Sequence, residues 1–462
     1  MDYKRKNVWL NIDENQKKDL FAISEDYIDF LNVGRTERLA VKEIIKRAEA
    51  AGYVDIEEKI KEGSLNAGDK VYARNKAKGV CLFHIGSEDL ENGLNIVGSH
   101  LDSPRLDLKP VPLAEDSNLA YFKTHYYGGV KKYQWTTIPL ALHGIIFTKD
   151  GQKVEVSIGD NDDEPVFTIS ELLIHLSRKL MDKPAREVIE GEQLKILVGS
   201  IPLNDEDDNP VKKNILNILN EKYGIIEEDF ITAEFEAIPA IKARHAGLDN
   251  SMILGHGHDD RVCAYATLNA LLDIETPQRT AVGLFVDKEE IGSTGSTGMA
   301  SQFFENTVLE LLNLKDKANL ISFKRTLKNS KVLSADVTHA YDPNFKDVSE
   351  LDNSAQFGCG VAVTKYTGSG GKFGSNDADA EYLQEVRAAF DKSNVVYQTG
   401  ELGAVDAGGG GTIAFILAEY VMDVVDCGTP VVSMHAPTEL ISKADLYSTV
   451  TAYKAFYENI WH

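Results

Sequence analysis

Two adjacent glutamates, Glu289 and Glu290, stand where an apolar run ends and a loop rich in glycine, serine and threonine begins. The apolar run, residues 281–286, has the length and composition of a buried strand. Neighbouring carboxylates repel each other unless a cation, a proton or water relieves them. A solvated turn explains most such pairs taken alone, so this pair gains meaning only from the rest of the chain.

Other residues that can bind metals stand at similar places in the chain. Open α/β sheets place their sites at the carboxyl ends of strands, so side chains that follow different strands can converge there. Three of them follow predicted strands, and one directly precedes a predicted helix. They are His100 after residues 94–97, Asp336 after 331–335, His435 after 430–434, and Asp259 before the helix at about 260–273.

Two histidines and three carboxylates are enough to hold two zinc-like ions. If Asp259 bridges the ions, each ion also takes one histidine and one carboxylate, and one glutamate is left as the base for a metal-activated water. Asp102 is placed to accept the second imidazole N–H of His100 and so fix its tautomer. Each residue alone has an ordinary explanation, such as a helix cap for Asp336. Together they predict a two-metal hydrolytic site.

The length and texture of the chain predict two domains, because 462 residues exceed what a single core usually holds. Residues 1–106 and 244–462 alternate strands and helices, which predicts an α/β domain with a mainly parallel sheet. Residues 107–243 predict an inserted, β-rich second domain. It contains a hairpin over 145–158 and a helix opened by Thr168 and Glu171 as a capping box.

The composition excludes several classes of protein. Lys and Arg number 49 and Asp and Glu 72, a net charge of −23 that argues against binding to nucleic acid or to an anionic membrane. The four cysteines lie far apart, with no C-x-x-C pair, as in reduced cytosolic proteins. No apolar stretch reaches membrane-spanning length. We therefore expect a cytoplasmic protein.

Several motifs, in order, resemble the aspartyl aminopeptidase family of dinuclear zinc metallopeptidases. Together they extend from about residue 100 to 436, and the segment 169–178 is also similar to a helix of the family's inserted domain. The motifs are Gly98-Ser-His-Leu-Asp-Ser-Pro104, Asp259-Asp-Arg-Val-Cys263, Glu289-Glu-Ile-Gly-Ser293, Ser334-Ala-Asp-Val-Thr-His-Ala340 and Ser433-Met-His-Ala436.

The resemblance implies a role for each matched residue, and two divalent ions, zinc by analogy, in each chain. Glu289 matches the general base, and the substrate-contacting positions are His175, His339 and Lys365. The implied metal ligands are His100, Asp259 as the bridge, Glu290, Asp336 and His435. Asp249-Asn250 is a competing candidate for the bridge, but it lacks the Arg-Val-Cys that follows Asp260, so we favour Asp259. In two-metal peptidases that the chain resembles, the bridging Asp precedes a cis peptide, expected here at Asp259–Asp260.

The expected activity is removal of an N-terminal residue from peptides, with a slight preference for acidic residues. Lys365 is the candidate cation for that preference, whereas Phe373, where relatives carry Tyr, argues for neutral residues. Family members assemble as dodecamers in which the inserted domain makes dimer contacts, so a homo-oligomer is also expected, with the inserted domain as dimerisation module or substrate lid. Two other readings stay open: an N-acyl amino-acid deacylase with the same metals, and a non-enzymatic scaffold.

Overall fold

The computed structural model of the chain describes residues 4–204, 208–368 and 370–460, which divide into two compact units. Unit 1 extends to Asp102, resumes over Ala243–Met434 and ends with the segment that begins at Glu439. Unit 2 consists of Ser103–Lys242 and the short segment His435–Thr438. The sequence predicts an insertion over residues 107–243.

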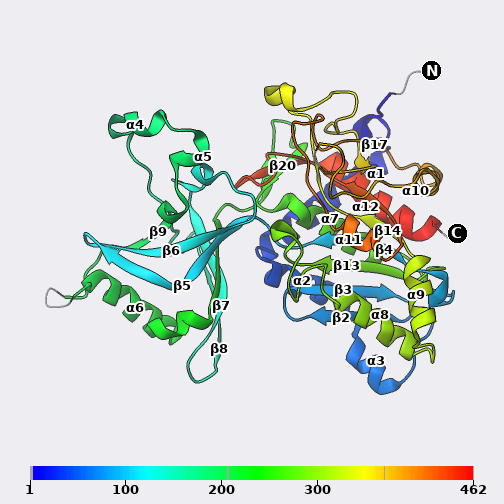
Figure 1. Cartoon of the computed structure of the whole chain (residues 1–462), viewed down its shortest axis with the longest axis horizontal. Helices are drawn as coiled ribbons and strands as arrows, with labels where there is room; N and C mark the ends of the chain where they lie inside the picture. Colours follow the sequence, from blue (N-terminus) through cyan, green and yellow to red (C-terminus); the bar gives the residue numbers. More distant parts are fainter. Residues whose placement is uncertain (1–3, 205–207, 369, 461–462) are drawn as a thin grey trace. The chain divides into compact units, whose positions relative to one another are not determined.

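Unit 1 is built on a nine-stranded sheet with the order β1-β2-β3-β13-β4-β14-β18-β16-β17 (Figure 1). The four central strands β13, β4, β14 and β18 are parallel, whereas β3 and β16 pair antiparallel with the outer members of that group. The α/β class is confirmed, with a mixed sheet. The strands are β1 (Val54–Asp55), β2 (Lys70–Asn75), β3 (Gly79–His84), β4 (Asn95–His100), β13 (Ala281–Val286), β14 (Lys331–Ser334), β16 (Val361–Thr364), β17 (Tyr397–Thr399) and β18 (Asp423–Gly428).

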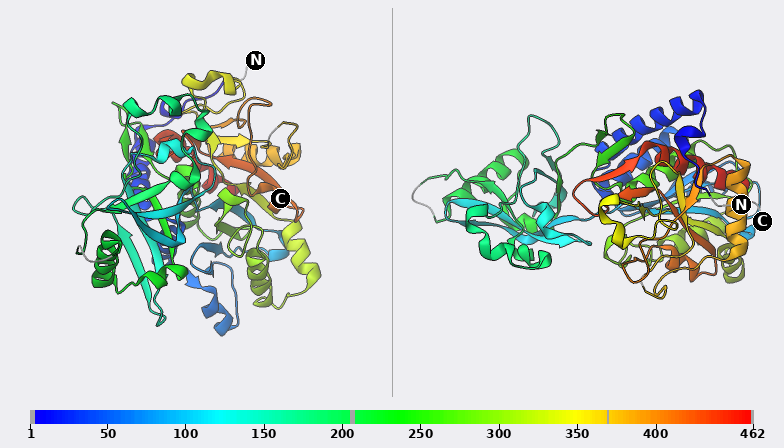
Figure 2. Two further views of the ribbon diagram at one scale, coloured as in Figure 1. Left: turned by 60° about the vertical axis from the view of Figure 1, so that its left-hand side comes forward. Right: turned by 90° about the horizontal axis from the view of Figure 1, so that it is seen from above.

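Helices cover both faces of this sheet, which explains why its central strands are continuous apolar runs. Alternate strand residues belong to two separate cores: Phe285 and Leu333 to one, and Leu284 and Val332 to the other. The first face is covered by α1 (Glu14–Val33), α2 (Glu37–Ala50), α7 (His258–Leu272), α10 (Ala380–Lys392) and α12 (Lys443–Asn459). The second is covered by α3 (Ile56–Glu62), α8 (Phe303–Asn313), α9 (Leu320–Lys328) and α11 (Ala414–Ala418). The right-hand view of Figure 2 shows α1, in dark blue, along one face of unit 1.

Local signals in the sequence account for the first two helices. The Asp13 side chain accepts backbone N–H bonds at the start of α1, and Gln16 completes a capping box. Thr36 caps α2 in the same manner. Elsewhere in unit 1, the strand predicted at 281–286 and the helix predicted at about 260–273 are confirmed.

A second, five-stranded sheet in unit 1 was not foreseen from the sequence. Its order is β11-β12-β20-β19-β15, and the strands are β11 (Arg244–Ala246), β12 (Met252–Gly255), β15 (Thr338–His339), β19 (Pro430–Val432) and β20 (Glu439–Ser442). The strand predicted at 430–434 is β19. His435 therefore follows a strand of this second sheet. The sequence predicts that it follows a strand of the large sheet, so that prediction is wrong.

Unit 2 contains a six-stranded antiparallel sheet with the order β8-β7-β10-β5-β6-β9. Its core is separate from those of unit 1 and includes Trp135, Leu140 and Phe122. The hairpin predicted over 145–158 is confirmed as β7 and β8. The elements are β5 (Arg105–Asp116), β6 (Leu119–Tyr127), β7 (Leu140–Phe147), β8 (Lys153–Ile158), β9 (Lys195–Gly199), β10 (Glu234–Pro239), α4 (Arg178–Met181), α5 (Ala185–Val188) and α6 (Pro210–Tyr223).

The helix predicted to begin at Thr168 is wrong. The carbonyl of Thr168 accepts the N–H of Leu197 on β9, and the carbonyl of Ile169 accepts the N–H of Thr137. These sheet-like bonds hold the backbone extended, so the capping-box signal at Thr168 and Glu171 is overridden by tertiary pairing. His175 instead lies in the single 3-10 turn Ile174–Leu176, where it is exposed.

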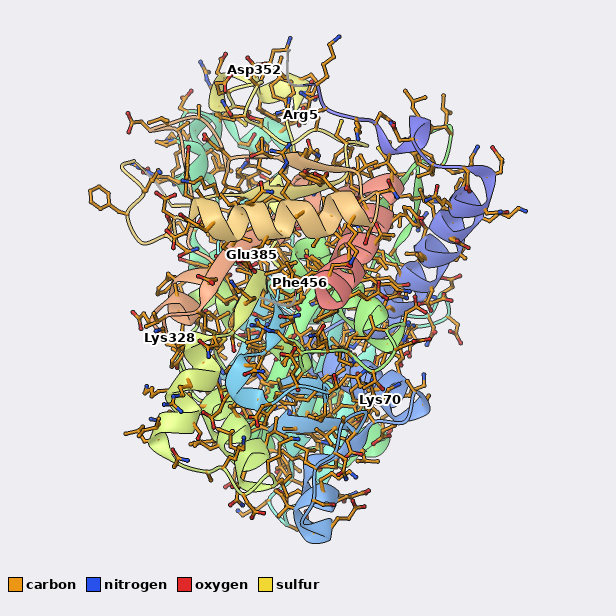
Figure 3. The ribbon with its side chains drawn as sticks, turned by 90° about the vertical axis from the view of Figure 1, so that its right-hand side faces the viewer. Arg5, Lys70, Lys328, Asp352, Glu385 and Phe456 are labelled. Atoms are coloured by element: carbon orange, nitrogen blue, oxygen red, sulfur yellow. The ribbon has the colours of Figure 1, made fainter. Side chains whose placement is uncertain are left out.

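The periphery of unit 1 is fastened by polar contacts. Figure 3 shows Arg5 and Asp352 side by side, and the Arg5 guanidinium donates to the Asp352 carbonyl at 2.5 Å. Glu385, on α10 in the same view, pairs with Lys331 of β14 at 2.9 Å.

All four cysteines are buried free thiols. Among the described residues, no helix has the length and apolar character needed to cross a membrane.

Candidate metal centre

The register of the large sheet brings the first set of candidate ligands to one edge. Val286, the last residue of β13, pairs with His100, the last residue of β4, and Ser334 of β14 pairs with Gly98. The three strands are parallel, so the turn at Glu289 and the loop at Asp336 begin at the edge where His100 lies.

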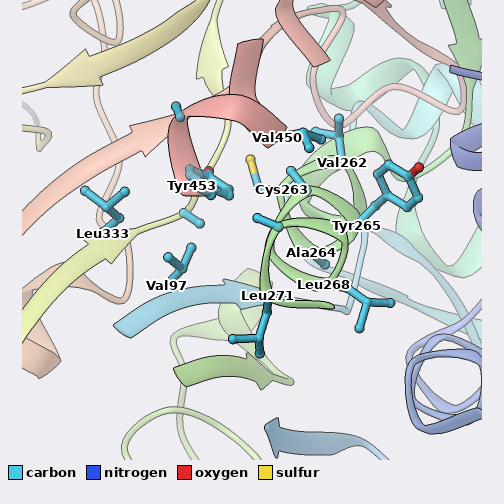
Figure 4. Packing of buried hydrophobic residues seen from close by; sticks show 14 of the residues in the cluster. Val97, Val262, Cys263, Ala264, Tyr265, Leu268, Leu271, Leu333, Val450 and Tyr453 are labelled. Carbon is cyan, nitrogen blue, oxygen red and sulfur yellow. The ribbon is translucent and has the colours of Figure 1, made fainter. Parts of the chain in front are cut away.

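Asp259 comes from the first turn of α7, on the first face of the same sheet. Figure 4 shows this helix packed with Cys263 and Leu271 near Val97 of β4 and Leu333 of β14. Gly257, with φ +77°, begins the turn, and Asp259 and Asp260 have non-helical backbone angles. The peptide bond between them is cis, as expected from the sequence.

These elements bring five predicted residues together in two groups that share His100. In each group, ligand atoms of one histidine and two carboxylates lie within 4.8 Å of one another. The first group is His100, Asp259 and Glu290, and the second is His100, Glu289 and Asp336. Histidine nitrogen and carboxylate oxygen are the ligands that zinc prefers in catalytic sites.

The hydrogen bonds of His100 identify which of its ring nitrogens faces the other ligands. Nδ1 lies 3.0 Å from the carbonyl oxygen of Asp102, and a carbonyl can only accept, so Nδ1 carries the proton. Nε2 then presents a lone pair 3.2 Å from Asp259 Oδ1 and 3.9 Å from Glu289 Oε2. A lone pair facing two carboxylates is repulsive unless a cation or a proton lies among them.

The pKa values of the cluster also indicate that its residues favour a bound proton or cation. Burial alone would lower the pKa of His100, but hydrogen bonds to Asp102 and Asp259 and the charge of Glu289 raise it well above its usual range. Withdrawal from water and the charges of Glu289, Asp260 and Asp259 raise the pKa of Asp336 well above its usual range. The donor set thus fits divalent cations.

Asp102 contacts both His100 and the turn that carries Glu289 and Glu290. Its carboxylate accepts the backbone N–H of Glu289 at 3.1 Å and that of Glu290 at 3.2 Å. Its Oδ1 also lies 3.3 Å from His100 Nδ1. One buried carboxylate therefore fixes the orientation of a histidine and of both glutamates, a wider role than the sequence analysis expected.

The remaining predicted residues are not members of these two groups. His435 and His175 belong to unit 2, and the Nδ1–H of His435 donates to the Gly129 carbonyl at 3.0 Å. That bond leaves the lone pair of His435 on Nε2, the form in which histidine binds metals.

His339 lies on β15, three residues after Asp336. Its Nε2 is buried and makes no hydrogen bond within the described residues, and burial lowers its pKa, so the ring is neutral at pH 7. A neutral imidazole can still donate one hydrogen bond.

Lys365 comes directly after β16. This strand runs antiparallel to β18, so it points toward the amino-terminal ends of the central parallel strands. The Nζ of Lys365 lies 3.2 Å from Asp377 Oδ1. Phe373 is 80% exposed. The competing Asp249 is exposed in the turn between β11 and β12, and its Oδ1 caps that turn by accepting from Ser251.

Two contacts that support the candidate ligands were not predicted from the sequence. Glu439 is buried on β20, and its Oε2 accepts the backbone N–H of Asp259 at 3.1 Å. Gly428 ends β18, and an added Cβ would overlap the carbonyl oxygen of Asp336. Glu439 stands 180 residues from Asp259, and nothing local in the sequence marks either contact.

Fold and site together define a class: α/β metallohydrolases with carboxylate and histidine ligands at the carboxyl edge of the sheet. Comparison with known proteins agrees. A model of the family described as aminopeptidase I zinc metalloprotease (M18) matches residues 30–457. The chain belongs to this M18 family.

Individual relatives extend the similarity to almost the full length. A probable M18 family aminopeptidase 1 of Clostridium acetobutylicum is 52% identical over 456 residues, 98% of each chain. The crystal structure of an M18 aminopeptidase from Thermotoga maritima has a TM-score of 0.95 at 43% identity and covers 99% of this chain and 100% of that one. The S. cerevisiae mApe1 dodecamer, at 20% identity, shares the fold with a TM-score of 0.76 over 94% of this chain and 96% of that one.

These findings establish the protein as a metalloaminopeptidase, a hydrolase of peptide bonds, and confirm the predicted family and activity. The two other readings, an N-acyl amino-acid deacylase and a non-enzymatic scaffold, find no support among these relatives.

Proposed function

We propose that the chain removes single N-terminal residues from peptides with two divalent ions, taken to be zinc as in the family description, and with Glu289 as the general base. The ligands in this proposal are His100, Asp259 as the bridge, Glu290, Asp336 and His435. The observation that carries it is the convergence of lone pairs at His100 Nε2, which faces Asp259 and Glu289. Because Nδ1 is committed to Asp102, only a proton or a cation can relieve this geometry.

The residues of the chain divide the work of the reaction. When bound, the ions supply Lewis acidity, which polarises the scissile carbonyl and lowers the pKa of a water molecule. Glu289 takes the proton of the attacking water and passes it to the leaving amine. His339, neutral and with a buried Nε2 that lacks a hydrogen bond within the described residues, donates to the oxyanion as it develops.

The preference for the N-terminal residue is the finer part of the proposal. The net charge of −23 disfavours an anionic peptide at long range, although salt screens this field beyond about 8–10 Å. A local cation must therefore supply any preference for Asp or Glu, and Lys365, with His175 or His339 assisting, is the proposed source. Asp377 already pairs with Lys365, and Phe373 is exposed beside the same loop, so we expect the acidic preference to be slight.

Unit 2 is proposed to join copies of the chain and to cover the substrate. The mApe1 of S. cerevisiae forms a dodecamer, and we propose a homo-oligomer here, with a dodecamer as its expected size. The segment that carries His175 exposes Leu173, Ile174 and Leu176 to solvent, each more than half accessible, which suits burial against a second copy. The reduced, buried cysteines support a cytoplasmic location.

A substrate panel combined with metal analysis on one preparation tests these proposals. Asp-, Glu-, Leu- and Ala-terminated substrates are compared by kcat/KM in the wild type and in Lys365→Ala, while bound metal is counted per chain. We expect about two ions, as in two-metal sites, and a loss of the acidic preference in the variant. Best cleavage of Leu substrates with an unchanged ranking in Lys365→Ala would refute the acidic preference. Faster release of amino acid from N-acetylated than from free dipeptides would instead favour a deacylase.

A further inference from the structure

The residue immediately before the proposed bridging aspartate is anchored by helix α1. Tyr27 of α1 and His258, the first residue of α7, are both fully buried, and the Tyr27 hydroxyl lies 2.6 Å from His258 Nδ1. The two residues stand 231 positions apart in the sequence. This contact therefore connects the N-terminal helix with the turn that presents Asp259.

The second nitrogen of His258 determines the direction of this hydrogen bond. Nε2 lies 3.1 Å from the carbonyl oxygen of Ile253 on β12, and a carbonyl can only accept. Nε2 therefore carries the ring proton, and Nδ1 accepts from the Tyr27 hydroxyl. The imidazole bridges a strand and a helix with both nitrogens occupied, so its position is fixed on two sides.

The backbone of Asp259 is held from the other direction by Glu439. The N–H of Asp259 donates to Glu439 Oε2 at 3.1 Å, and Glu439 pairs with Gly255 across β12 and β20. Asp259 thus lies between two anchors: the ring of His258, fixed through Tyr27, and the carboxylate of Glu439. Its Oδ1 in turn lies 3.2 Å from His100 Nε2.

We infer that Tyr27 is a positioning residue of the metal centre, which acts through His258 to fix the turn that aims Asp259. This inference rests on the proposed role of Asp259 as a metal ligand. Groups that orient ligands from outside the coordination sphere typically change metal affinity by about 10- to 100-fold when they are removed. Tyr27 touches neither substrate nor metal in this scheme.

Tyr27→Phe is a narrow test, because it removes one oxygen and keeps the ring that packs against Tyr265 with centroids 5.2 Å apart. Tyr457→Phe is the matched control. Tyr457 is also buried, and its hydroxyl donates to the Val282 carbonyl of β13 at 2.9 Å. Both variants lose one buried hydrogen bond, so both are expected to lower the Tm of the metal-free protein by similar amounts.

The decisive readout is the zinc dissociation constant, measured by chelator competition on the metal-free full-length chain. We expect Kd to rise about 10- to 100-fold in Tyr27→Phe and to stay at the wild-type value in Tyr457→Phe. His258→Gln should raise Kd as well, and adding Tyr27→Phe to it should cost little more, because the two residues act as one unit. Should Tyr27→Phe fail to fold, His258→Gln carries the test against the same control.

The outcomes separate this inference from the proposed function. A wild-type chain that binds no zinc would overturn the metal centre itself. Zinc binding in the wild type with equal Kd values in Tyr27→Phe and Tyr457→Phe would overturn only the role of Tyr27. Independent, additive losses in the double variant would show that Tyr27 does not act through His258.

Discussion

The two units bury their sheets in different ways. In unit 1 all six residues of β13 are buried, because helices cover both faces of the sheet. In unit 2 the edge strand β8 alternates between residues that face the core, such as Val156 and Ile158, and exposed residues such as Lys153 and Glu155. A sheet packed on both faces can hold ligands at its edge with little freedom. A sheet packed on one face leaves surface for contacts with other molecules.

The largest expected effect concerns the two adjacent glutamates at the edge of the unit 1 sheet. Glu289→Gln should lower kcat by about 10²- to 10⁴-fold while both metals stay bound, because the amide cannot accept the water proton. Glu290→Gln should instead lose metal, since it removes a proposed ligand. Activity assays with metal counts on both variants make the comparison. Equal metal loss in the two would contradict the division of roles.

A pair of glycine substitutions compares the tolerance of the two units. Gly428→Ala places a Cβ against the carbonyl of Asp336, so we expect a loss of about 3 kcal/mol of stability or more, together with weaker metal binding. In Gly224→Ala in unit 2 the added Cβ meets no atom within 4 Å. Its φ of +70° alone should lower the free energy of unfolding, by about 1–2 kcal/mol. Urea unfolding and metal titration distinguish the two. Normal metal affinity in Gly428→Ala would show that the Asp336 loop adapts.

Titration of a buried acid gives a third test within unit 1. Asp445 accepts the N–H groups of Gly358 and Gly360, yet burial raises its pKa to about 8. The unfolded chain ionises near the ordinary value, so the folded state holds one extra proton between the two pKa values. Stability therefore falls as pH rises from about 4 to about 8, by up to about 1.4 kcal/mol per pH unit from this group.

Asp445→Asn should remove this slope, because an amide does not titrate. Urea unfolding between about pH 5 and about pH 8, at constant metal, measures it. Identical pH slopes in the wild type and in Asp445→Asn would show that the acid is already ionised in the folded chain.

The smallest effect on stability is expected on the surface of unit 2. Ile174→Ser and Leu176→Ser replace side chains that are 67% and 68% exposed, so the free energy of unfolding should change by no more than about 0.5 kcal/mol. If unit 2 joins copies of the chain, the same variants shift the assembly toward smaller species. Sedimentation at several protein concentrations measures this. Unchanged assembly would place the interface elsewhere.

The sequence was informative where the structure is local. The apolar run 281–286 is β13, and the helix predicted at about 260–273 is α7. The motifs marked His100, Asp259 and the two glutamates, which the structure brings within reach of one another.

The sequence failed where distant pairing decides the outcome. Thr168 has every local feature of a helix start, but its carbonyl pairs with Leu197. β18 escaped notice because Asp423 and Asp426 interrupt its apolar residues, although Asp426 is buried against the hydroxyl of Thr412. The contacts of Asp259 with Glu439, and of His258 with Tyr27, join segments that no periodicity relates.

The chain crosses between the two units four times, because unit 2 takes both Ser103–Lys242 and His435–Thr438. On the ribosome, the hairpin of β7 and β8 can form as soon as it emerges, since its strands are neighbours in sequence. β4, in contrast, must wait for the whole of Ser103–Lys242 before β13 and β14 exist to pair with it. Both neighbours of β4 in the large sheet are thus made late, and until then its apolar surface is exposed to chaperones and to aggregation.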